Sequence, residues 1–357
     1  MKTSDFSYDL PEHLIAQHPL EDRSESRLLV LDGRTGAIRH DWFRRFPDLL
    51  EPGDCLVLND TRVLPARLTG TREGSGGRVE FLLLRRLDQD RFDVLVRPGR
   101  RLKEGDRVAF LPGTPGEGGL SAQILERTAT GGRIVRFEYS GIWETVLDRA
   151  GTIPLPPYIR EPLADPERYQ TVYARENGSA AAPTAGLHFT PEVLDRIRDR
   201  GIRTAFLTLH VGLGTFRPVQ AESVDDHRMH EESFVLPADV ADAVAETRRR
   251  HGRVVAVGTT TCRVLETMAL PDGTVQPGAG TTRLFLRPGS RFQCVDALLT
   301  NFHLPRSTLL MLVSAFAGRD AVLGAYREAI AREYRFFSFG DAMFLSSRRE
   351  PGHDAGT

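Results

Sequence analysis

The sequence predicts an α/β main domain, with a mixed or mostly parallel sheet and flanking helices, interrupted by a small antiparallel β-barrel. Two observations predict this fold. The second half of the chain alternates strand-like and helical segments, which is typical of a sheet with helices on its faces. Residues 63–140 instead show short strands between turns rich in glycine and proline. Since β/α-type segments lie on both sides, the β domain is most simply inserted into the larger one.

Capping residues mark the elements of the second half. Thr190 and Pro191 suit the N-cap and first position of a helix that ends at Gly201. An apolar run at 253–258 predicts a buried strand, and a helix follows over 259–268. The other expected elements are a strand over 202–211, a buried helix over 305–317 and an amphipathic helix over 320–334. A further helix is expected to open within residues 236–239 and to end at residues 251–252.

The chain of 357 residues is long enough for two domains. We expect the main domain to comprise residues 1–62 and 141–346, the barrel residues 63–140, and a disordered tail residues 347–357. The strands expected in the barrel are 79–84, 92–96, 107–110 and 134–137.

The charge of the chain is balanced, with 47 basic and 48 acidic residues, so no global field indicates a nucleic-acid binder. Between residues 62 and 107, however, eleven arginines and one lysine face seven acidic residues. An RNA-facing surface would explain this surplus, but arginines on solvated strand faces are the commoner cause.

The cysteines Cys55, Cys262 and Cys294 lie far apart, without the spacing of a disulfide framework or a zinc site. The cluster of acidic residues and histidines at 225–232 lacks a metal-binding spacing, and we interpret it as a solvated loop that gates a site. No signal peptide or membrane-length apolar run is present. We therefore expect a soluble cytoplasmic protein without a metal or a membrane contact.

A run of small residues, 178–190, ends in His188 and Phe189. Such a run lets backbone approach a ligand, or it packs two elements tightly, and composition does not decide between the two. Segment 209–216 carries His210 and two glycines after a strand, but it fails as a dinucleotide fingerprint.

Polar residues also gather at other strand ends, where open α/β sheets bind ligands. Thr259–Thr261 start a helix on which Arg263 and Glu266 lie one turn apart, so a ligand site and an ordinary N-cap with an ion pair fit equally well. Segment 299–305 places His303 before a buried helix, and Asp341 is a carboxylate in an apolar segment.

Taken together, these segments resemble the S-adenosylmethionine:tRNA ribosyltransferase-isomerase family of the queuosine pathway. The resemblance runs in order along almost the whole chain, over segments 8–11, 58–63, 153–158, 169–174, 178–190, 210–216, 257–266, 300–305 and 334–343. It implies an α/β domain interrupted by a small β-barrel.

The resemblance also implies the reaction. The family transfers the ribosyl part of S-adenosylmethionine to 7-aminomethyl-7-deazaguanine at the wobble position of tRNA, forming epoxyqueuosine and releasing adenine and methionine. S-adenosylmethionine is then a consumed substrate, no cofactor is needed, and the partner is a tRNA anticodon stem-loop bound by a monomer.

Histidine is the natural general base for such proton transfers. The candidate catalytic residues are His188 and His303 for proton transfer, His210 as a third candidate, and Asp341; either Asp341 or Glu266 would face the sulfonium. The candidate substrate-binding residues are Thr184, Gly186, Phe189, Gly212, Gly214, Thr215, Phe216, Thr259, Thr260, Thr261, Arg263, Glu266, Asn301 and Phe302.

Without the resemblance, a noncatalytic RNA-binding module and an S-adenosylmethionine-dependent tRNA methyltransferase would compete with this reaction. The chain lacks the glycine-rich loop expected of a methyltransferase, and it lacks the basic excess expected of an RNA-binding module.

Overall fold

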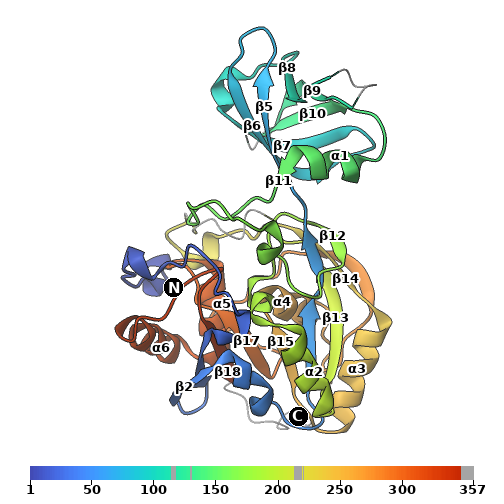
Figure 1. Cartoon of the computed structure of the whole chain (residues 1–357). Coiled ribbons are helices and arrows are strands. Elements are labelled where there is room, and N and C mark those ends of the chain that lie inside the picture. The colour runs from blue at the N-terminus through green and yellow to red at the C-terminus, as the bar shows by residue number, and fades with distance from the viewer. Residues whose placement is uncertain (114–117, 129–130, 213–218, 220, 347–357) are drawn as a thin grey trace. The chain divides into compact units, whose positions relative to one another are not determined.

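Two sheets organise the chain in the computed structural model, which describes residues 1–113, 118–128, 131–212, 219 and 221–346. The chain divides into two compact units (Figure 1). Unit 1 comprises residues 1–62, 156–176 and 182–357, and unit 2 comprises residues 63–155 and 177–181. The predicted tail, 347–357, lies outside the described residues.

Unit 1 is built on a mixed sheet that has nine strands among the described residues, in the order β16-β14-β13-β3-β15-β17-β18-β1-β2. The neighbours β13, β3, β15 and β17 run parallel, whereas β17 and β18 are antiparallel. The strands are β1 (Arg27–Asp32), β2 (Ile38–Trp42), β3 (Cys55–Asn59), β13 (Arg203–Leu209), β14 (Glu232–Leu236), β15 (Val254–Val257), β16 (Gly278–Thr282), β17 (Ala297–Asn301) and β18 (Ala342–Ser346).

Helices cover this sheet (Figure 1). The α-helices of unit 1 are α2 (Pro191–Asp199), α3 (Ala238–Arg249), α4 (Thr259–Thr267), α5 (Thr308–Ala317) and α6 (Arg319–Ala331). Short 3-10 helices are η1 (Thr3–Phe6), η2 (Glu12–Leu14), η3 (Arg23–Glu25), η4 (Phe43–Leu49), η6 (Pro166–Tyr169), η7 (Thr184–His188) and η9 (Val224–Asp226). The α/β prediction is confirmed.

The central strands are buried on both faces, which is why they read as continuous apolar runs. Side chains alternate along each strand, so Leu56 and Leu58 of β3 enter one core cluster together with Val255 and Val257 of β15. Phe189 packs into the same cluster, from the loop that precedes α2. One face of the sheet is thus closed by η4, η7 and α2.

The helix ends follow the predicted capping, with one difference. Thr190 accepts a hydrogen bond from the Val193 N–H at the start of α2, as predicted. The buried helix expected from residue 305 begins only at Thr308, because Arg306 has a positive φ of 56° and Ser307 forms the N-cap. Residues 305–307 therefore form a turn before α5.

Unit 2 is the predicted antiparallel barrel. Among its described residues, the strands follow the order β11-β5-β6-β7-β10-β9-β8, and pairing of β5 with β8 closes six of them. The strands are β5 (Arg67–Arg72), β6 (Arg78–Arg86), β7 (Arg91–Arg97), β8 (Arg107–Leu111), β9 (Leu120–Arg127), β10 (Arg133–Glu138) and β11 (Gly151–Thr152), with η5 (Gly99–Arg101) after β7. β4 (Thr61–Val63) and β12 (Glu176–Ser179) pair in a separate two-stranded sheet.

The barrel unit extends to residue 155, whereas the sequence placed its end at 140. Helix α1 (Trp143–Ala150) accounts for the difference, because Trp143 and Leu147 are buried in the barrel core. The Trp143 ring lies 4.7 Å from Phe92 and 4.9 Å from Phe137, measured between ring centroids. An amphipathic helix that follows the all-β segment thus belongs to the barrel unit.

Among the described residues, no single helix is long and apolar enough to cross a membrane. The pair α5 and α6 reaches the required length and composition only together, and it is bent by 113°.

Candidate functional site

Four parallel strands end at the same edge of the unit 1 sheet, at Leu209, Asn59, Val257 and Asn301. Asn59 links two of these ends. Its Nδ2 donates to the Leu209 carbonyl at 3.0 Å, and its Oδ1 accepts from the Leu209 N–H at 3.0 Å. Nδ2 also lies 3.3 Å from Thr260 Oγ1 at the start of α4. This edge is therefore held together by polar side chains.

A small cavity opens at this edge. Its walls come from the strand ends, from η7 and from the first turns of α4 and α5. The lining residues are Ala182, Pro183, Thr184, Ala185, Val211, Gly258, Thr259, Thr260, Thr300, Asn301, His303 and Leu309. Four residues of the predicted run of small residues, 182–185, thus form one wall, and we call this cavity the sheet-edge cavity.

Asn301 holds its side-chain amide in one orientation within this cavity. Its Oδ1 accepts from Thr184 Oγ1 at 3.0 Å, and its Nδ2 lies 3.3 Å from the Phe337 carbonyl oxygen and 3.1 Å from His188 Nε2. A backbone carbonyl only accepts hydrogen bonds, so the atom that faces Phe337 is the amide nitrogen. The same nitrogen donates to His188 Nε2, which must carry a lone pair.

His188 is consequently a neutral imidazole with its proton on Nδ1. That nitrogen donates to Ser26 Oγ at 2.8 Å, since the Ser26 hydroxyl itself donates to the Arg23 carbonyl at 2.9 Å. Burial, with smaller contributions from the charges of Arg335 and Arg23, lowers the pKa of His188 to about 3. His188 lies behind Asn301 with both ring nitrogens engaged, so the geometry favours a positioning role over the predicted proton transfer.

His303 lines the cavity itself. Its Nε2 lies 2.8 Å from Thr300 Oγ1, and its backbone N–H donates to Tyr326 Oη at 2.8 Å. Nδ1 has no hydrogen-bond partner within the part of the chain that the structure describes. Burial lowers the pKa of His303 to about 3, so the ring is neutral at physiological pH and offers a lone pair.

The start of α4 supplies the third side of the cavity. Gly258 separates β15 from α4 with a φ of 89°, a conformation that favours glycine. Thr259 and Thr260 line the cavity, whereas Thr261 turns away and donates to the Val257 carbonyl at 2.7 Å. The first N–H groups of a helix lack partners inside the helix and favour an anion.

Arg263 and Glu266 have other partners than the predicted ones. Arg263 forms a buried ion pair with Glu232 of β14, and Glu232 Oε1 accepts the Gly212 N–H at 2.9 Å. The Glu266 carboxylate accepts the backbone N–H groups of residues 293–295, at 2.6 to 3.0 Å. The structure therefore contradicts the intrahelical ion pair, and neither side chain lines the sheet-edge cavity.

Asp341 is also engaged in structural contacts. Its carboxylate accepts the backbone N–H of Arg27 at 2.9 Å, the Arg27 Nε–H at 3.1 Å and the backbone N–H of Arg335 at 2.8 Å. A buried carboxylate with three donors is satisfied without a ligand. Its predicted position opposite a sulfonium has no support in this geometry.

The predicted aromatic contacts are core residues. Phe189 packs on Phe43 and Phe46, and Phe302 packs between Tyr326 and Phe336. Both rings are fully buried.

Gly186 and His210 lie near the cavity without lining it. A Cβ on Gly186 would stand 2.1 Å from the Tyr173 hydroxyl oxygen, so this glycine serves close packing. His210 Nδ1 lies 2.8 Å from Thr61 Oγ1, and burial lowers the pKa of His210. Gly212 is described above, whereas Gly214, Thr215 and Phe216 lie outside the described residues.

Sequence reasoning missed Asn59, Thr300 and Gly258. Asn59 and Thr300 each follow three apolar strand residues, and a polar residue at the end of a buried strand was the signal that would have found them. Within the described residues, no group of three or more histidine, cysteine or acidic side chains is placed to hold a metal.

The two buried histidines predict acid sensitivity. Both pKa values fall from 6.5 to about 3 on folding, so the unfolded chain binds more protons as pH drops below about 6.5. The contribution of these two histidines to the free energy of unfolding is fully present above about pH 6.5 and is lost as pH falls. Between pH 7 and pH 5 we expect a loss of about 2 kcal/mol per histidine in the free energy of unfolding.

Urea unfolding at the two pH values measures this loss. The double variant H188Q/H303Q lacks both imidazoles. Between pH 7 and pH 5 its free energy of unfolding should fall by about 4 kcal/mol less than that of the wild type. An equal loss in both proteins would show that these imidazoles are protonated in the folded state.

A polar, histidine-containing cavity at the carboxyl edge of an α/β sheet is typical of enzymes that bind small polar ligands. The chain belongs to the family described as queuosine biosynthesis protein, whose model matches residues 3–345.

Individual relatives agree with the family. A curated protein from Caldanaerobacter subterraneus subsp. tengcongensis is 57% identical over 345 residues, covering 97% of this chain and 100% of the relative. One from Symbiobacterium thermophilum shows the same identity and coverage. Both are named S-adenosylmethionine:tRNA ribosyltransferase-isomerase.

A solved structure from Thermotoga maritima is described as S-adenosylmethionine tRNA ribosyltransferase. It is 41% identical in sequence, with a TM-score of 0.55, and the match covers 96% of this chain and 100% of that one. The large mixed sheet with helices and the closed barrel thus have a counterpart in a solved relative.

Proposed function

We propose that this chain is an S-adenosylmethionine:tRNA ribosyltransferase-isomerase. It transfers and isomerises the ribosyl part of S-adenosylmethionine onto 7-aminomethyl-7-deazaguanine at the tRNA wobble position, forming epoxyqueuosine and releasing adenine and methionine. The observation that carries this function is full-length identity of 54–57% to curated relatives of that name. The sheet-edge cavity supports it with a neutral imidazole and fixed polar groups.

S-adenosylmethionine enters as a consumed substrate, so the reaction needs no separate cofactor. Its sulfonium acidifies the adjacent ribose 5′ carbon, and removal of a proton there gives an ylide. Adenine then leaves, the aminomethyl group of the deazaguanine adds, and ring opening with loss of methionine forms the epoxide.

His303 is our candidate for the proton transfers. When Nε2 carries the ring proton and donates to Thr300 Oγ1, the lone pair on Nδ1 can accept a proton from the substrate. The low pKa of His303 means that the ring holds this proton only briefly. It can then return the proton to a leaving group such as adenine.

The other cavity residues orient the substrate in this proposal. Asn301 and Thr184 present an amide and a hydroxyl whose orientation His188 fixes from behind. Thr259 and Thr260, with the N–H groups of the first turn of α4, suit the carboxylate of the methionine part. The contacts described above give structural roles to Asp341, Arg263 and Glu266.

Product analysis tests the function directly. Purified protein is incubated with labelled S-adenosylmethionine and tRNA that carries the deazaguanine precursor, and unmodified tRNA serves as the control. Adenine and methionine in equal amounts, dependent on the precursor, are the expected products. S-adenosylhomocysteine would instead indicate a methyltransferase, and unchanged S-adenosylmethionine with bound tRNA an RNA-binding module.

We further propose that the protein acts as a monomer in the cytoplasm. The three cysteines support a reducing compartment, because all are free and buried, and burial raises the pKa of each thiol. Size-exclusion chromatography with light scattering tests the oligomeric state.

A further inference from the structure

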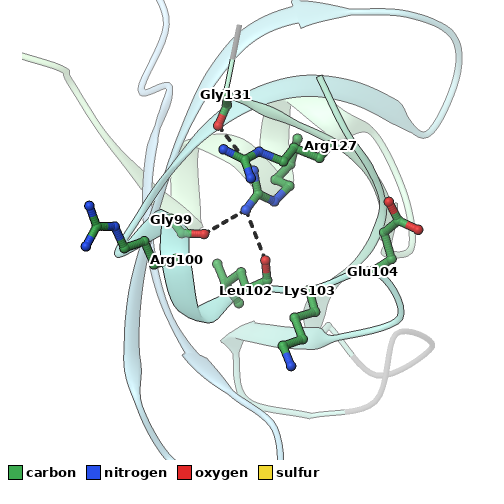
Figure 2. Close-up of a pocket in the computed structure, with 8 residues that line it drawn as sticks. Gly99, Arg100, Leu102, Lys103, Glu104, Arg127 and Gly131 are labelled. Carbon is green, nitrogen blue, oxygen red and sulfur yellow. Dashed lines mark hydrogen bonds between the residues drawn. The ribbon is translucent and has the colours of Figure 1, made fainter. Parts of the chain in front are cut away.

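A second cavity lies in the barrel unit, far larger than a water site, at about 690 Å³. Figure 2 shows the side chains of Arg100, Lys103, Glu104 and Arg127 around it. Arg133 lines it as well, so four basic side chains face one acidic side chain. We call it the barrel cavity.

Arg133 gives the barrel cavity a fixed positive charge. Its side chain is buried, and its guanidinium donates to the carbonyl groups of Gly99, Leu102, Gly131 and Gly132 at 2.6 to 3.1 Å. Figure 2 shows three of these carbonyl groups, those of Gly99, Leu102 and Gly131. Carbonyl groups hold the guanidinium in place but do not neutralise its charge.

Arg127 adds a second charge beside the first. It stands opposite Arg133 in the pairing of β9 with β10, and the repulsion between the two contributes to a lowered pKa of Arg133, after the larger effect of burial. The exposed side chains of Arg127 and Lys103 form no ion pair with any residue that the structure describes. Glu104 is the one carboxylate in the lining and acts on Arg133, so the four basic side chains exceed it and the cavity favours an anion.

Six other arginines of the barrel already have an acidic partner. Their ion pairs are Arg67 with Glu80, Arg72 with Asp106, Arg86 with Glu144, Arg91 with Asp88, Arg107 with Glu138 and Arg136 with Asp90. Among the described residues, Arg78 and Arg85 of β6 also lack an ion pair, but they do not line the barrel cavity, whereas Arg100, Lys103, Arg127 and Arg133 all line it.

We propose that the barrel cavity binds a phosphate group of the RNA backbone, with Arg127 and Lys103 as the contacting side chains and Arg133 as the fixed charge behind them. The choice of RNA rests on the function proposed above. A chain of net charge −1 has no global attraction for RNA, so a tRNA substrate must be held by local charge. Guanidinium groups also match phosphate geometry.

The test compares the double variant R127A/K103A with the wild-type protein and with R78A/R85A, which removes two exposed charges from β6 of the same barrel. Arg133 is left intact because it holds the surrounding loops. Affinity for the precursor anticodon stem-loop RNA is measured directly, at several salt concentrations. Steady-state kinetics give KM for the RNA, KM for S-adenosylmethionine and kcat.

We expect R127A/K103A to weaken RNA binding and raise KM for the RNA by about tenfold or more for each lost contact. The slope of log K against log salt should fall in magnitude by about 2, one for each contact. kcat at saturating RNA and KM for S-adenosylmethionine should stay unchanged, and R78A/R85A should behave as the wild type.

The outcomes separate this inference from the proposed function. Wild-type turnover with unchanged RNA affinity and salt slope in R127A/K103A overturns the inference and leaves the function standing. If the wild-type protein shows no turnover but its RNA binding depends on Arg127 and Lys103, the proposed function is wrong and the phosphate site in the barrel cavity is supported. If the variant loses binding of inorganic phosphate but keeps its RNA affinity, the cavity binds a small free anion and the RNA assignment is wrong.

Discussion

The variant H303Q is expected to lower kcat for adenine release by about 10²–10⁴-fold, the usual contribution of one acid–base group. Glutamine places an amide near the position of Nε2, so the contact with Thr300 is retained while the basic Nδ1 is lost. The glutamine amide keeps a polar group in the buried cavity wall, so the surrounding packing should be retained. Release of adenine from labelled S-adenosylmethionine, with saturating precursor tRNA, measures the effect.

Two matched variants define what the loss means. H13Q replaces an exposed histidine outside the cavity and should keep wild-type activity. H188Q removes a group that orients Asn301 from behind, so we expect a smaller loss, with a raised KM for S-adenosylmethionine. If H303Q turns over normally while H188Q is inactive, the two roles must be exchanged.

The second large effect is expected on stability. Breaking the buried ion pair between Arg263 and Glu232 with R263M should lower the free energy of unfolding of unit 1 by about 3–5 kcal/mol. Both side chains are almost completely buried, at 4% and 3% exposure, so the carboxylate left behind loses its countercharge. The Gly212 N–H, a neutral donor, still donates to this carboxylate.

The tryptophans allow this loss to be assigned to one unit. Trp42 belongs to unit 1 and Trp143 to unit 2, so urea unfolding followed by fluorescence in a W143F background reports on unit 1. The exposed pair Arg198 and Asp195 is the control, and R198A should change stability by less than about 1 kcal/mol.

The double variant R263M/E232L removes both charges and should recover part of the stability lost in R263M. An R263M protein as stable as R198A would show that the pair is solvated in solution, which contradicts the structure.

Local sequence signals predicted helices α2 to α6 and some of the strands. The Thr190 cap, the strand at 254–257 and the start of α4 at Thr259 depend on residues within a few positions of each other, and they lie where the sequence placed them. The division into an α/β sheet and a barrel follows from the spacing of apolar runs, which is also local. Helix α1 was not predicted, because its apolar face is buried only when the barrel has closed, and strands such as β1, β14 and β18 were not predicted either.

The candidate site was predicted in part. The segments that line the sheet-edge cavity were all recognised, since parallel strands bring their polar carboxyl ends to one edge. The sequence could not show which polar residue faces the cavity. Thr261 differs from Thr260 by one position, yet it bonds back to Val257 while Thr260 lines the cavity.

The sequence by itself determined the fold class, the insertion of the barrel and the four segments that meet at the sheet edge, because these depend on periodicity and capping. Only the tertiary structure decided the partners of the charged groups. Arg263 lies one turn from Glu266 in sequence but pairs with Glu232, and Asp341 binds Arg27. Such pairs join strands and helices far apart in the chain, so their energies depend on sheet order and burial, which no local pattern encodes.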